Sequence, residues 1–359
     1  MSIATDTSET AGGASRREKL FAVINRASAW LTALGFGWLT PLLRIAAGDD
    51  PRQQMSELRD SLLFPLMGLV VFVSGWAILA PQVQTSLGAI PGPVQVLEQA
   101  GGLWQDHQAE RERQTRFYLM QEERNAELLA EDPEADVRIR AYTGNPTFID
   151  QIFTSLKTVG LGFAFATIVA VPLGIASGLS KPFNGALNPI VQLFKPVSPL
   201  AWLPIVTMVV SAVYVDASEA FPKALVISAV TVTLCSLWPT LINTTLGVAS
   251  IDKDLVNVSK VLRLSTAKTV TKLVLPSALP LIFTGLRLSL GVGWMVLIAA
   301  EMLAQNPGLG KFVWDEFQNG SSSSLARIMV AVLTIGIIGF LLDRVMFTLQ
   351  TAFTFSSER

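Results

Sequence analysis

The strongest constraint on this chain is a series of long uncharged runs that recurs from residue 61 onward. A helix needs about 20 apolar residues to cross roughly 30 Å of hydrocarbon. Four runs reach that length without a charge, and two more reach it if charged residues near the helix ends extend to the headgroups. We therefore predict an all-α membrane protein with six spanning helices, at residues 61–81, 152–179, 194–215, 223–247, 278–303 and 326–349.

The composition agrees with a membrane protein and removes several classes of function. Charged residues make up 15% of the 359 positions, whereas soluble domains carry roughly 25%. The 27 basic and 28 acidic residues nearly cancel, which argues against a nucleic-acid-binding surface. Cys235 and His107 are the only residues of their types, so we expect neither a disulfide framework nor a metal site. The sequence also lacks a P-loop and a nucleophile paired with a base, so we expect no enzyme site and no bound cofactor.

Residues 1–60 form a basic segment before the first predicted span. The first 15 residues are small and polar, and we expect them to be disordered. Residues 27–43 are apolar and contain Trp30 and Trp38, but their length is near the lower limit for a crossing. We favour a helix lying in the membrane interface over a seventh crossing.

The positions of Lys and Arg predict the orientation of the spans. The N-terminal segment and the loop between the fourth and fifth spans are rich in both, which places them in the cytoplasm. Both termini, including the tail at residues 351–359, are then cytoplasmic. The insertion at residues 82–150 has six Arg and no Lys against twelve acids and falls on the periplasmic side. Within it, residues 105–134 predict a solvated helix or helical hairpin, with His107 as a solvated side chain.

The inner loop at residues 250–276 has the most distinctive pattern in the chain. Leu255, Val258 and Leu262 recur at helical spacing and predict a short amphipathic helix, with its apolar face packed on its own bundle. The wetter face carries three polar residues, Asn257, Lys260 and Arg263.

A second short helix is expected to begin after Ser265, whose side chain can cap it, and to end at Leu275 before Pro276. Periodicity alone leaves two interpretations open, an ordinary amphipathic connector and a docking surface for a partner protein.

This loop resembles the EAA loop of permease subunits of ABC importers, whose pattern is Glu-Ala-Ala, three residues, Gly, nine residues, Ile, any residue, Leu-Pro. Aligned on Leu275 and Pro276, which match strictly, the other motif positions fall on Asn257, Val258 and Ser259, then Arg263 and Leu273. The stretch from Asn257 is similar to the version in nitrate, cyanate and bicarbonate permeases. Further similarity to that subgroup lies at residues 194–205, 236–244 and 279–303.

The resemblance covers about residues 60–350 apart from the insertion, and it implies a type I ABC importer permease. The permease core would be residues 151–350, and two copies would form a pore in the inner membrane. A periplasmic solute-binding protein would deliver the substrate, and cytoplasmic ATPase subunits, which hold ATP and Mg²⁺, would dock on the EAA loops. The implied substrate is a small inorganic anion, nitrate or nitrite first, with bicarbonate, cyanate or an organic sulfonate such as taurine as alternatives. The implied ATPase-coupling residues are Leu255, Asn257, Val258, Ser259, Lys260, Leu262, Arg263 and Pro276.

Candidates for the translocation path are Trp202, Trp238, Arg287 and Trp294. Arg287 either offers its planar fork to a planar anion, or reaches the headgroups or anchors the EAA loop. Trp202 and Trp238 lie in spans interrupted by proline, where packing explains a tryptophan equally well. Glu301 would repel an anion, so we expect it in a structural ion pair or in contact with the binding protein.

Two functions of other classes stay open. A membrane-embedded enzyme needs paired intramembrane carboxylates or histidines, and only Glu301 and Asp343 come near this, each at a helix end. A secondary transporter would move its substrate without any ATPase.

Overall fold

The computed structural model describes residues 24, 25, 28, 31, 32, 35–85, 88–132, 137, 139–215, 218, 220–321 and 323–355. The predicted disorder of the first 15 residues and the end of the tail, residues 356–359, lie outside this part of the chain. Within it, five helices are long and apolar enough to cross a membrane, and a bent helix pair adds a sixth span if it is counted as one. The predicted all-α membrane architecture is confirmed.

The first long helix runs from Pro51 to Gln82. It comprises α3 (Pro51–Leu58), a π-helical turn (Arg59–Leu63), α4 (Phe64–Leu79) and a 3₁₀ turn (Ala80–Gln82). It begins before the predicted residue 61 because Asp50 caps it, its carboxylate accepting the Arg52 N–H at 3.0 Å. The preceding α2 (Leu39–Ala46) is short.

The predicted interfacial helix at residues 27–43 is interrupted. Gly35 has a φ of +88°, and the chain turns there before α2 begins at Leu39. A positive φ of this kind suits glycine, which has no Cβ to clash. Residues 27, 29–30 and 33–34 lie outside the described part, and the position of this segment in the membrane interface stays a prediction.

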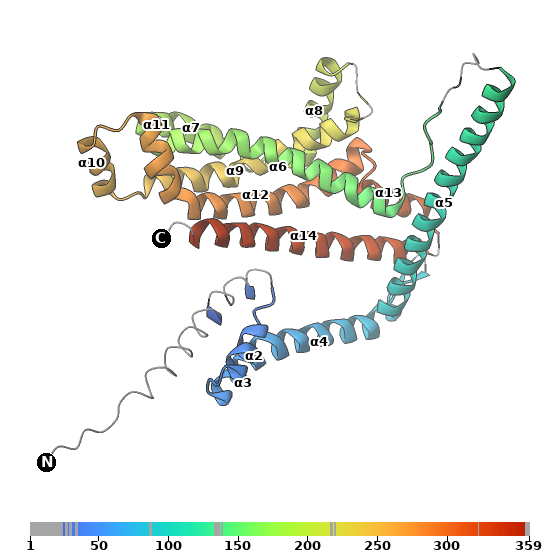
Figure 1. The fold of residues 1–359 in the computed structure, drawn as a ribbon, viewed down its shortest axis with the longest axis horizontal. Helices are drawn as coiled ribbons and strands as arrows, with labels where there is room; N and C mark the ends of the chain where they lie inside the picture. Colours follow the sequence, from blue (N-terminus) through green and yellow to red (C-terminus); the bar gives the residue numbers. More distant parts are fainter. Residues whose placement is uncertain are drawn as a thin grey trace.

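The other long helices pack side by side as a bundle (Figure 1). They are α6 (Phe148–Leu179), α9 (Lys223–Ala249), α12 (Leu275–Ala304) and α14 (Ser324–Phe355). The α6 and α9 backbones approach closely because Gly174 and Gly178 face α9. A Cβ at Gly174 would lie 2.6 Å from the Thr244 Cβ, so a larger residue would push the helices apart.

The third predicted span, residues 194–215, is wrong as a single helix. The structure has α7 (Lys181–Phe194) and α8 (Pro199–Val213), bent by 102° relative to each other. Pro199 starts α8, and proline disfavours helical geometry in the residue before it. With 15 residues, α8 is about 22 Å long and falls short of crossing the bilayer alone.

The insertion after the first long helix is dominated by α5 (Pro93–Glu131), a single helix of 39 residues rather than a hairpin. A two-stranded antiparallel ribbon of β1 (Gln84–Thr85) and β2 (Gly88–Ala89) precedes it. Figure 1 shows the second half of α5 projecting beyond the bundle.

Short helices lie at the two ends of the bundle (Figure 1). At one end are α10 (Lys253–Val261) and α11 (Thr266–Thr269), and at the other are α13 (Leu309–Asn319) and the base of α5. We call these the α10 end and the α5 end.

Candidate functional site

The predicted coupling segment forms α10, but its apolar face is free. The side chains of Leu255, Val258 and Leu262 are 47%, 51% and 63% exposed, and that of Val261 is 81% exposed. The prediction that this face packs on its own bundle is therefore wrong. The bundle is already closed there by a buried cluster of Val248, Val274, Ala278 and Ile282. The apolar face of α10 is left available to another molecule.

The polar coupling candidates divide by exposure. Asn257 and Arg263 are exposed, whereas Ser259 is buried, and Pro276 is half-buried. The side chain of Lys260 lies outside the described part of the chain.

Arg263 ends α10 in the left-handed conformation, with a φ of +48°. The Leu264 N–H donates to the Ser259 carbonyl at 3.1 Å, the bond of a Schellman motif, which places Arg263 at the position that usually holds glycine. Arg263 is also where the EAA pattern has its Gly. The chain therefore makes the turn after α10 with arginine at the position where the EAA pattern has glycine.

The helix after this turn begins as predicted but does not end at Leu275. Ser265 caps α11, accepting the Lys268 N–H at 3.4 Å, which confirms the predicted start. One helix then continues from Thr266 to Ala304. A π-helical turn at Val270–Val274 directly precedes Leu275 and Pro276, and its wider hydrogen-bonding pattern admits a proline that a regular α-helix would exclude.

An aromatic cluster of Phe194, Trp202 and Trp238 lies at the bend between α7 and α8. The Phe194 ring centroid is 5.6 Å from that of Trp202 and 6.5 Å from that of Trp238, to which it is nearly parallel. The two indole Nε1 atoms are buried without an acceptor among the described residues. An unpaired buried donor costs about 1–3 kcal/mol.

The other two path candidates have partners within the protein. The Arg287 guanidinium binds both carboxylate oxygens of Asp343 on α14, with a Nη2–Oδ2 distance of 2.7 Å, and lies over the Phe347 ring. The Trp294 indole N–H donates to the Ile335 carbonyl at 3.0 Å. Both side chains therefore join α12 to α14.

Glu301 caps α13 and forms no ion pair among the described residues, so the first of its two expected roles is wrong, and contact with the binding protein stays a prediction. Its buried carboxylate accepts the Gly310 N–H at 3.0 Å and lies 2.8–2.9 Å from the Ser155 hydroxyl of α6. Ser155 in turn accepts the Leu309 N–H at 2.8 Å. The N-terminal amides of α13 supply the partial positive charge that a cation would otherwise provide.

The base of α5 is tied to the bundle by polar contacts. Arg327 of α14 bridges Asp106 of α5 at 2.8 Å and Glu316 of α13 at 3.1 Å. His107, predicted to be solvated, instead lies 2.7 Å from the Thr147 hydroxyl. These contacts link the insertion to α6, α13 and α14.

The projecting half of α5 is braced by the returning chain. Gln121 makes two hydrogen bonds with the Arg140 backbone, and the Tyr142 hydroxyl donates to Glu110 at 2.8 Å. That bond to a carboxylate raises the pKa of Tyr142 above its ordinary value.

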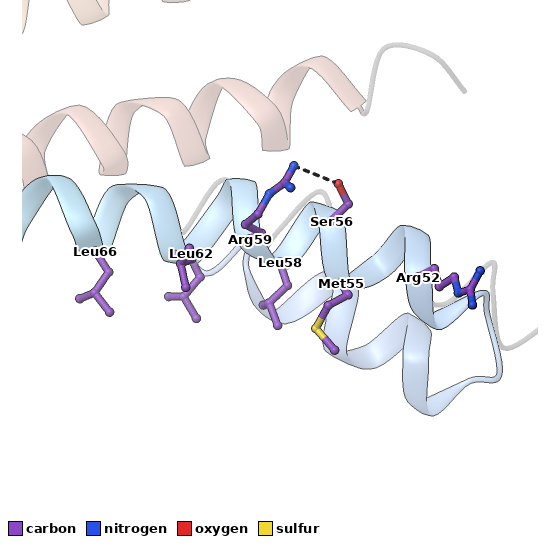
Figure 2. A pocket seen from close by; sticks show the side chains of 8 residues that line it. Arg52, Met55, Ser56, Leu58, Arg59, Leu62 and Leu66 are labelled. Carbon is purple, nitrogen blue, oxygen red and sulfur yellow. Dashed lines mark hydrogen bonds between the residues drawn. The ribbon is translucent and has the colours of Figure 1, made fainter.

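A groove lies on the first long helix, where α3 meets α4. Figure 2 shows Met55, Leu58, Leu62 and Leu66 projecting on the same side, while Arg59 donates to the Ser56 hydroxyl at 3.4 Å. Its lining is largely apolar, which suits contact with lipid chains or protein rather than an ion.

Comparison with known proteins assigns the family. Residues 170–355 match the family of binding-protein-dependent transport system inner membrane components. The chain belongs to this family. The permease is 36% identical to the bicarbonate transport system permease protein CmpB of Synechococcus elongatus, over 81% of this chain and 89% of that protein. It is 41% identical to the nitrate import permease protein NrtB of Synechocystis, over 54% of this chain and 66% of that protein.

Among solved structures, the MetNI methionine ABC transporter in inward-facing conformations matches with a TM-score of 0.49 at 15% identity, covering 58% of this chain and 96% of that one. Family membership confirms the predicted class, a multi-pass inner-membrane permease.

Sequence reasoning missed α7, the Phe194 contacts and the capping role of Glu301. The sequence did carry a signal for the capping of α13, because Glu301 is followed closely by Pro307, Gly308 and Gly310. Proline and glycine favour turns, and glycine leaves its backbone N–H accessible. No signal in the sequence pointed to the Arg327 bridge, whose partners are far apart along the chain.

Proposed function

We propose that the permease forms the membrane pore of an ATP-driven importer for a small inorganic anion, with nitrate or nitrite as the first candidate. The observation that carries this proposal is the similarity to both nitrate and bicarbonate permeases, two classes whose substrates are monovalent oxyanions. Bicarbonate is the second candidate because the match to its permeases covers more of the chain. Cyanate and organic sulfonates such as taurine are more distant alternatives.

We assign the α10 end to the cytoplasm and to the ATPase subunits. Exposed apolar side chains on a short helix at the bundle end favour a protein partner, and α10 is where the EAA loop resemblance lies. The sequence predicted that the apolar face of α10 packs on its own bundle, whereas we propose that this face contacts the ATPase. The apolar face of α10, and not only its polar face, would enter the ATPase, with the exposed Asn257 and Arg263 beside it. Ser259 and Lys260 stay coupling candidates through the EAA resemblance alone.

The remaining parts of the importer follow from this orientation. The α5 end faces the periplasm and the solute-binding protein, and both termini lie in the cytoplasm. ATP and Mg²⁺ belong to the ATPase subunits, so this chain contributes no catalytic site. Two copies enclose the path, and lipid covers the outer surface, including the groove of Figure 2.

Uptake by cells lacking this permease tests the proposal. We expect loss of ATP-dependent uptake of labelled nitrate and nitrite, with uptake of bicarbonate and taurine less affected. The same cells complemented with the wild-type gene should regain nitrate and nitrite uptake. Loss of bicarbonate uptake alone would favour the second candidate. Transport that survives deletion of every ATPase partner would contradict the importer and favour a secondary transporter.

A further inference from the structure

In the described part of the permease, two tryptophans have buried indole N–H groups without an acceptor. They are Trp202 of α8 and Trp238 of α9, and neither Nε1 atom has a partner among the residues that the structure describes. Trp76 and Trp294 differ, because their N–H groups donate to the carbonyls of Pro91 and Ile335. Buried donors are nearly always paired, so two unpaired indole donors on the neighbouring helices α8 and α9 call for an explanation.

One aromatic residue contacts both indole rings. Phe194, the last residue of α7, lies against both rings, with centroid distances of 5.6 Å to Trp202 and 6.5 Å to Trp238. Trp238 is 91% buried, with a relative exposure of 9%. The rings therefore come from three helices that meet at one point.

The backbone at this point is irregular. Residues 195–198 separate α7 from α8, and the helices are bent by 102°. Within a membrane, a non-helical backbone is tolerated only where protein surrounds it or where it lines a water-filled cavity. The bend thus favours a place on or beside the path rather than one facing lipid.

We propose that the Trp202 and Trp238 indole N–H groups donate hydrogen bonds to the transported anion at a narrow point of the path, with Phe194 holding both rings. This inference rests on the proposed function and adds to it a site and a class of ligand.

The chemistry of the donors selects a monovalent, weakly hydrated oxyanion. Indole N–H groups are neutral donors, and the clusters around them consist of hydrophobic side chains. Two neutral donors compensate the dehydration of a singly charged anion far better than that of a divalent anion such as sulfate, because the dehydration cost rises steeply with charge. Nitrate and bicarbonate share the required chemistry, a single charge on a small planar group with several acceptor oxygens.

The test replaces each donor while keeping an aromatic ring. Trp202→Phe, Trp238→Phe and the double variant are reconstituted in proteoliposomes with the ATPase and the solute-binding protein. Uptake of labelled nitrate and of labelled bicarbonate is measured in separate arms. Trp38→Phe, at the residue before α2, is the matched control. In parallel, ¹⁵N-labelled indole signals of the wild-type complex in nanodiscs are followed by NMR during titration with sodium nitrate and with sodium bicarbonate.

We expect each single variant to lower the maximal uptake rate about tenfold, with complex assembly and ATP hydrolysis unchanged, and the control to match the wild type. Nitrate or bicarbonate, but not sulfate, should shift the Trp202 and Trp238 indole signals.

Uptake by both single variants within twofold of the wild type would overturn the inference, and so would indole signals that do not move with either anion. If the signals shift but the wild type imports neither anion, the donor assignment stands and the proposed function fails.

Discussion

At the scale of single residues, Arg263 occupies a backbone conformation that costs a side-chain-bearing residue about 1–2 kcal/mol. Its φ of +48° completes the Schellman turn from α10 into the loop before α11. The EAA pattern places glycine there, and this permease keeps the turn with arginine. Because glycine would avoid this strain, we propose that arginine is kept here for its charge, which contacts the ATPase subunits.

Arg263→Gly should relieve this strain and stabilise the end of α10 by about 0.5–1 kcal/mol. Hydrogen exchange at the α10 amides measures the change, with Arg263→Ala as the control that loses the charge but keeps the strain. Equal protection in the two variants would contradict the argument from backbone conformation.

The tryptophans make a second point at this scale. Trp202, Trp238 and Trp294 are the same residue type in neighbouring spans, so the sequence names all three equally as path candidates. Of these three, only Trp294 has a carbonyl partner for its N–H in the described part of the chain. That difference depends on which helix lies opposite, which local sequence does not encode.

At the scale of elements, prolines near helix starts have two different effects. Before Pro65 and before Pro276, π-helical turns let the helix continue. At Pro199, the helix breaks and turns by 102°. Sequence rules place a boundary near each proline, but they do not say whether the chain absorbs the proline or breaks.

The position of α13 depends on close contact with the Glu301 carboxylate. Gly308, the residue before α13, lies against that carboxylate so closely that a Cβ would overlap it. Glu301 could then no longer reach the Gly310 N–H, and a buried carboxyl group would lose part of its hydrogen bonding.

Gly308→Ala should therefore destabilise the permease by about 1–3 kcal/mol. The thermal unfolding midpoint of the detergent-solubilised protein is the measurement. Gly160→Ala in α6 is the control, because nothing lies within 4 Å of its added Cβ and alanine favours the helix. If both variants unfolded at the wild-type temperature, the α13 contact would have to be looser than the structure indicates.

At the scale of the whole molecule, the two ends of the bundle carry different surfaces. The α10 end presents an exposed apolar helix, and the α5 end presents a long charged helix braced by Arg327 and by its returning chain. If the ATPase docks at the α10 end alone, replacing an exposed apolar residue by Asp should weaken ATPase association at the α10 end and leave it unchanged at the α5 end.

Leu262→Asp should abolish co-purification of the ATPase subunits while membrane insertion is unchanged, because a charge enters the proposed apolar contact. Ile139→Asp, at an 80% exposed position next to α5, makes the same change at the other end and should leave ATPase association intact. The assignment of α10 would fail if Leu262→Asp retained the ATPase, or if both variants lost it.

The sequence by itself determined the membrane class, the approximate positions of most spans, the start of the helix after Ser265 and the family resemblance. These features follow from length, hydropathy and local capping, which act within a few residues along the chain. Tertiary structure alone decided which face of α10 is free, that Arg287 pairs with Asp343, that Glu301 caps α13, and which indole N–H groups lack a partner among the described residues. Each of these depends on packing between segments distant in sequence, because a side chain's partner is set by the helix that folding places beside it.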